Sequence, residues 1–151
     1  MIDIENIIVN MIQQEVDDRY IARFPNFCVY STSVEIPEGF PCVTAEITGN
    51  TTLQRTQEFG DPLEHHVSII LTINVYTNNK TGAKELAKDI FRTIDDLLQR
   101  KHFTRVMAMP MPNIDRTVSR YTGRYSAIVG RPYEVEADGE TIQTFPVYRG
   151  V

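Results

Sequence analysis

The sequence has few cysteines, no long apolar run and no excess of positive charge. Two cysteines in 151 residues are too few for a disulfide framework. The most apolar stretches stay well short of the roughly 20 residues that a membrane-spanning helix needs. The 15 lysines and arginines stand against 20 aspartates and glutamates, and the net charge of −5 disfavours a protein that binds nucleic acid through phosphate contacts. What remains is an ordinary globular composition, 42% hydrophobic and 23% charged, of a length that predicts one domain.

Sequence motifs for catalysis and for metal or cofactor binding are also missing. The chain has no glycine-rich phosphate loop, no serine nucleophile elbow and no zinc-ligand spacing. His65 and His66 are adjacent, but neighbours on a strand point to opposite faces and cannot easily chelate one metal. Asp17–Asp18 and Asp95–Asp96 fall on predicted helices, where adjacent residues diverge by about 100° and cannot share a proton. The sequence therefore offers no recognisable catalytic residue, and we expect no metal and no cofactor.

The two cysteines, Cys28 and Cys42, flank a turn at residues 37–41. If the flanking strands form a simple hairpin, Cys28 lies opposite residue 47, and the offset from Cys42 is about 17 Å along the strand. A disulfide needs Cα atoms closer than about 7 Å. We therefore expect two separate, buried and inert thiols.

Apolar periodicity predicts two helices and a set of strands. The helices cover residues 3–23 and 83–102, where apolar side chains recur at spacings of three and four. The strict alternation from Val67 to Val75 is the strongest strand signal. Other strands are predicted at 27–34, 42–48, 103–109 (ended by Pro110) and 115–129. Asp138-Gly139 predicts a tight turn between 133–137 and 140–145.

This order of elements predicts an α+β fold. Each helix has one apolar stripe and the best strand has one apolar face, so both helices should pack on one face of a mainly antiparallel sheet. Residues 1–129 form this α+β domain, and residues 130–151 form a C-terminal hairpin extension. The polar stretch 48–63 has two glycines and no period. We expect it to be a mobile loop that contacts a partner.

Charge is unevenly distributed along the chain. Residues 1–64 hold 11 acids and 3 bases, net −8, whereas residues 65–133 hold 5 acids and 11 bases, net +6. Identical copies with such an asymmetry can attract each other head to tail, unless folding interleaves the segments. Arg116, Arg120 and Arg124 recur at a spacing of four and share one face of the predicted strand. They line a channel or meet a neighbour's acids, or else form a solvated sheet face.

Several segments of the chain resemble the tail terminator, or tail completion, proteins of tailed bacteriophages and phage-tail-like particles. They span about residues 25–129. They are Phe40-Pro41-Cys42-Val43, Ile73-Asn74-Val75-Tyr76-Thr77-Asn78, Lys84 through Leu98, Phe103-Thr104-Arg105, Pro110-Met111-Pro112-Asn113 and Tyr121-Thr122-Gly123-Arg124-Tyr125.

The resemblance implies a virion structural protein with no active site. It implies a ring, usually of six copies, at the head-proximal end of the tail tube. Such a ring stops tube polymerisation, joins the tube to the neck or head-completion proteins and, in contractile tails, meets the sheath. The resemblance also implies that DNA only passes through the lumen and that no membrane is involved. It implies a location in the virion tail or neck, after assembly in the cytoplasm of the bacterial host.

The candidate interface or lumen residues come from the basic middle of the chain and from the terminal hairpin. They are Arg105, Arg116, Arg120, Arg124, Tyr133 and Phe145. Two alternatives stay open at this point. One is another neck component, such as a head-closure protein. The other is a small-ligand-binding or enzymatic α+β domain whose site is not recognisable in the sequence.

Overall fold

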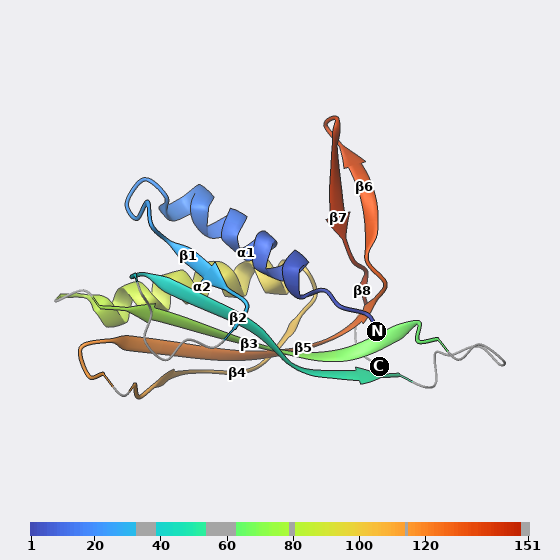
Figure 1. Cartoon of the computed structure of the whole chain (residues 1–151). Coiled ribbons are helices and arrows are strands. Elements are labelled where there is room, and N and C mark those ends of the chain that lie inside the picture. The colour runs from blue at the N-terminus through green and yellow to red at the C-terminus, as the bar shows by residue number, and fades with distance from the viewer. Residues whose placement is uncertain (33–38, 54–62, 79–80, 114, 149–151) are drawn as a thin grey trace.

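The computed structural model describes residues 1–32, 39–53, 63–78, 81–113 and 115–148 (Figure 1). Two helices and eight strands follow one another along these residues. In chain order they are α1 Glu5–Tyr20, β1 Cys28–Tyr30, β2 Cys42–Thr52, β3 His66–Thr77, α2 Ala83–Arg100, β4 Thr104–Met111, β5 Ser119–Gly130, β6 Tyr133–Ala137, β7 Glu140–Thr144 and β8 Val147–Tyr148.

The predicted α+β architecture is confirmed. The main sheet has the order β1-β2-β3-β5-β4, and the short β8 pairs with the end of β5. All of these pairs are antiparallel except β1 with β2. Figure 1 shows α1 and α2 together on one face of this sheet. The β6–β7 hairpin forms a separate two-stranded sheet.

Strand β3 is the centre of the sheet, paired with β2 on one side and with β5 on the other. Its alternating residues Val67, Ile69, Leu71, Ile73 and Val75 are fully buried. They form one floor of the core, and the helices supply the opposite layer. The period-two pattern therefore identified both the strand and its buried face.

The two helices bury the stripes that their spacing predicted. In α1, the side chains of Ile8, Ile12 and Val16 are almost fully buried. The hydroxyls of Tyr20 on α1 and Thr93 on α2 lie 3.2 Å apart, within hydrogen-bond distance. A surface ion pair of 2.9 Å between Glu15 and Arg100 joins the same helices. The helical layer is thus held by apolar packing with polar ties at its margin.

The predicted loop at 48–63 is wrong for its first part. Residues 48–52 belong to β2, and Gly49 to Thr52 pair with Ile70 to Val67. Thr48, Asn50 and the following threonines are exposed, so this end of the strand has no buried face and shows no apolar alternation. A polar strand end cannot be told from a loop by periodicity. Residues 54–62 lie outside the described residues.

The boundaries of β4 and β5 also differ from those predicted. Strand β4 continues through Pro110 to Met111, because it is an edge strand where a missing N–H costs no ladder hydrogen bond. Strand β5 begins at Ser119, not at residue 115. Before it, the Asp115 carboxylate accepts hydrogen bonds from the backbone and hydroxyl of Thr117. Arg116 therefore lies in a turn and not on the face of β5.

Candidate functional site

The β6–β7 hairpin projects from one end of the main sheet (Figure 1). Its turn residues Asp138 and Gly139 have φ of 52° and 79°, the left-handed pair that a two-residue hairpin requires. Every residue of β6 is exposed. An isolated hairpin of this kind is only marginally stable in water. Its exposure therefore marks it as a candidate contact surface.

The two faces of the hairpin differ in chemistry. Val135 lies opposite Ile142, and Tyr133 lies on the same face; their side chains are 40%, 49% and 50% exposed. Glu134 and Glu136 point to the other face because they alternate with these residues. Asp138 and Glu140 add two carboxylates at the turn, whereas residues 133–145 contain no lysine or arginine. The hairpin thus offers an apolar face and four acids.

The base of the hairpin is anchored to the main domain. Phe145 is 8% exposed, and its ring meets the ring of Phe103 edge to face at a centroid distance of 6.3 Å. The Gly130 N–H donates to the Pro146 carbonyl at 3.1 Å. Phe145, a candidate contact residue from the sequence, therefore holds the hairpin in place. Tyr133 is the candidate that remains accessible.

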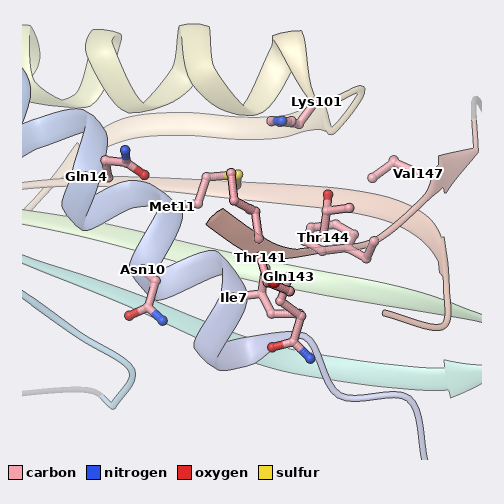
Figure 2. Close-up of a pocket in the computed structure, with 11 residues that line it drawn as sticks. Ile7, Asn10, Met11, Gln14, Lys101, Thr141, Gln143, Thr144 and Val147 are labelled. Carbon is pink, nitrogen blue, oxygen red and sulfur yellow. The ribbon is translucent and has the colours of Figure 1, made fainter. Parts of the chain in front are cut away.

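A cleft of about 400 Å³ separates β7 from the first half of α1 (Figure 2). Ile7 and Met11 line it from the helix, and Thr141 and Gln143 line it from the strand. The hairpin therefore stands clear of α1 along part of its length. Lys101 is the one ionisable side chain among the described residues that line the cleft.

A second hollow, which we call the basic groove, lies at the opposite end of the sheet. It measures about 330 Å³ and is lined by Lys84, Ala87, Pro110, Met111, Pro112, Asn113, Arg116, Val118, Ser119, Arg120 and Tyr121. It therefore combines three cations with an apolar floor, and no Asp or Glu is among its described lining residues. It forms where the start of α2, the end of β4 and the approach to β5 meet.

Arg120 lies on the same helix-free face of β5 as Arg124, where its side chain makes two contacts. Its Nε donates to Asn74 Oδ1 at 3.0 Å, and the same oxygen accepts from the Thr122 hydroxyl at 2.7 Å. The guanidinium also lies 5.7 Å from the centre of the Tyr76 ring. Burial raises the pKa of Tyr76 above its ordinary value, and the positive charge of Arg120 opposes that rise. Arg120 is therefore a positioned cation that bonds Asn74 through its Nε.

The structure separates the other candidate arginines. Arg124 is exposed on the helix-free face of β5, opposite Thr72 and Met107, and does not line the groove. Arg105 lies on the helix side, where Nη1 donates to Asp95 Oδ2 at 2.9 Å. The predicted row of arginines is thus reduced to Arg116 and Arg120 in one groove. The sequence reasoning missed Lys84, because helix and strand meet only in the fold.

Asp95 is the most buried carboxylate of the described residues, and its partners are structural. Its Oδ1 accepts from the Tyr125 hydroxyl at 2.6 Å, and Oδ2 accepts from Gln99 at 2.6 Å and from Arg105. Burial, followed by the hydrogen bond to Asp95, raises the pKa of Tyr125 far above its ordinary value. The hydroxyl therefore stays protonated and ties the centre of β5 to α2.

The expected separation of the cysteines is wrong. Strand β1 runs parallel to β2, and the register places Cys28 directly opposite Cys42. Both thiols are free; Cys28 is exposed and Cys42 is buried. Burial, with a smaller contribution from Cys28, raises the pKa of Cys42 to about 12, which keeps this thiol protonated.

The described residues also bear on metal binding and on membrane insertion. Among these residues, no group of three or more His, Cys, Asp or Glu side chains is placed to hold a metal ion. Neither of the two described helices has the length and apolar character to cross a membrane. Comparison with known proteins gives no match, either to a family model or to a curated protein.

Proposed function

We propose that this chain is a virion structural protein: a tail terminator that forms a closed homomeric ring on the head-proximal end of a phage tail tube or of a phage-tail-like particle. In this role it stops tube polymerisation and joins the tube to the neck proteins. In a contractile tail it also meets the sheath. The tube lumen, through which DNA passes, continues through the ring.

The observation that carries this proposal is the pair of unlike surfaces at opposite ends of one sheet. The projecting hairpin is acidic and apolar, and the groove at the other end is basic and apolar. Unlike surfaces favour head-to-tail association, which closes into a ring when the rotation between copies allows it. A ring of this type suits the end of a rotationally symmetric tube.

The segments that resemble tail terminators support the same proposal by their position. They fall on the start of β2, the end of β3, α2, and the paired strands β4 and β5. These elements form the sheet and its helical cover, whereas the hairpin lies beyond them. In the proposed function, the elements that resemble tail terminators form the domain, and the hairpin serves assembly.

The test is to add the purified chain to the tail tube protein of the same particle during polymerisation. We expect shorter tubes with annular density at one end in negative-stain electron microscopy. Unchanged tube lengths with both ends bare would contradict the proposal. A reconstruction of the intact particle that places the chain above the tube, against the head, would instead make it a head-closure protein.

A further inference from the structure

We infer that the β6–β7 hairpin of one copy docks into the basic groove of a second copy of this chain. The inference rests on the proposed function for the closure of the ring and deepens it by naming the two surfaces in contact. The hairpin strands are Tyr133–Ala137 and Glu140–Thr144, and the groove centres on Lys84, Arg116 and Arg120.

Distance along the sheet excludes an intramolecular contact. The hairpin follows the end of β5, and the groove lies at its beginning. Eleven residue steps from Ser119 to Gly130, at roughly 3.4 Å each, span about 37 Å. Figure 1 shows the hairpin at one end of the sheet and the β4–β5 connection at the other. A hairpin that docks into this groove must therefore come from another molecule.

Charge selects a second copy as that molecule. Glu134, Glu136, Asp138 and Glu140 give the hairpin four negative charges with no base between residues 133 and 145. The groove presents three cations and no acid among its described lining residues. No ion pair joins any of these seven groups to another part of the described chain. A hairpin-to-hairpin contact would bring acids together and is repulsive.

Apolar surface gives the contact its second component. The hairpin leaves Tyr133, Val135 and Ile142 between 40% and 50% exposed. The groove has an apolar floor that includes Met111 and Val118. Docking removes these surfaces from water and adds the packing that a lone two-stranded sheet lacks. Glu140, opposite Ala137, shares the docking face and meets the exposed Arg116 and Lys84 at the rim, whereas Glu134 and Glu136 lie on the other face and add long-range attraction.

Charge reversal with rescue tests the inference on the full chain. The hairpin is changed in one variant, called the arm variant, which carries Glu134→Lys, Glu136→Lys and Glu140→Lys. The groove variant carries Lys84→Glu and Arg116→Glu. Asp138 is kept for its turn conformation and Arg120 for its bond to Asn74. Sedimentation velocity measures self-association at chain concentrations up to roughly 1 mM, so that a dissociation constant in the millimolar range is still detected. Far-UV circular dichroism and melting check that each variant folds.

We expect the wild type to associate and each variant to lose more than about tenfold in association constant. The chain that carries both sets of reversals should associate again, because the charges are complementary once more. A control with Asp18→Lys, Asp89→Lys and Asp96→Lys makes the same change in net charge as the arm variant and should associate like the wild type. A monomeric wild type, or a double variant without rescue, would overturn the inference.

The inference and the proposed function fail in different ways. Rescue in solution, with no chain found at a tail end, keeps the contact and removes the tail terminator. A ring at the tail end that both variants still form keeps the tail terminator and removes this contact.

Discussion

At the scale of single residues, Tyr125 is the side chain whose loss has the clearest expected effect. Tyr125→Phe leaves Asp95 Oδ1 buried without its 2.6 Å donor, although Gln99 and Arg105 still serve Oδ2. An unmet buried acceptor costs about 1–3 kcal/mol. Urea unfolding at pH 7 should show that loss, and Tyr133→Phe, which removes an exposed hydroxyl, should not. Equal stability of the two variants would mean that Asp95 does not depend on this bond.

The same tyrosine predicts a sensitivity to alkali. Burial chiefly raises the pKa of Tyr125 in the folded state above the ordinary value of 10.0. The protonated tyrosine therefore makes its full contribution to the free energy of unfolding below about pH 10, and that contribution is lost as the pH rises further. The wild type should therefore lose stability above about pH 10, and Tyr125→Phe should lose less over the same interval. Unfolding free energies measured between pH 8 and pH 11 test this, and parallel pH profiles would contradict it.

A side chain larger than that of Gly123 should cause a packing defect at the centre of β5. A Cβ at this position would overlap the Cζ and Cε2 atoms of Phe91. That ring is 3% exposed and packs against Tyr121 at a centroid distance of 4.8 Å, so it cannot move aside freely. Gly123→Ala should cost about 1–3 kcal/mol of unfolding free energy. Gly39→Ala, whose Cβ meets nothing within 4 Å, is the control, and equal denaturation midpoints would refute the overlap.

At the scale of secondary structure, β3 offers a matched pair of neighbours on opposite faces. Leu71 is fully buried, and Ile70 is 41% exposed. Leu71→Asp should prevent folding because a lone buried carboxylate has no partner to replace its water. Ile70→Asp should fold and melt cooperatively. Circular dichroism of the two variants checks this, and a folded Leu71→Asp would mean that the strand presents its other face to the core.

The elements that the sequence predicted well are those with one buried face. Strand β3 and both helices alternate apolar and polar side chains at their own period, because one side meets the core and the other meets water. The end of β2 was missed because residues 48–52 have no buried side. The extent of β4 was missed because Pro110 is tolerated at a sheet edge.

Pairing between strands was harder to predict than the strands themselves. Sequence pattern does not distinguish a hairpin from a parallel pair, so the register of Cys28 with Cys42 appeared only in the fold. The groove likewise depends on which elements meet in the fold, and the sequence pattern does not show this. Arg116 and Arg120 were predicted as part of a strand row, but Lys84 joins them from α2 and Arg124 does not line the groove. The hairpin was predictable because Asp138-Gly139 is a local signal.

At the scale of the whole molecule, folding keeps part of the charge asymmetry that the chain shows along its length. Part of the acidic first segment is neutralised within the fold, as where Glu15 pairs with Arg100. The acids of the hairpin and the cations of the groove lie at opposite ends, and no other described residue neutralises them in this way.

That distribution predicts that association weakens as salt is added. Raising the ionic strength from about 0.1 M to about 1 M shortens the screening length from about 10 Å to about 3 Å. The attraction between hairpin and groove should fall, while the apolar part of the contact remains. Sedimentation velocity of the wild type in increasing NaCl measures the effect. Association that strengthens with salt would show that apolar burial dominates the contact.

The central position of β3 has a consequence for hydrogen exchange. Both edges of this strand are paired and one face is fully buried, so its amide protons are released only when the whole domain opens. The β6–β7 hairpin is paired only with itself, and its amides should exchange through local opening at a much lower free energy. Deuterium uptake in β3 therefore reports the global stability of the chain. Deuterium uptake in the hairpin reports whether the hairpin is docked, so assembly can be followed on the unmodified protein.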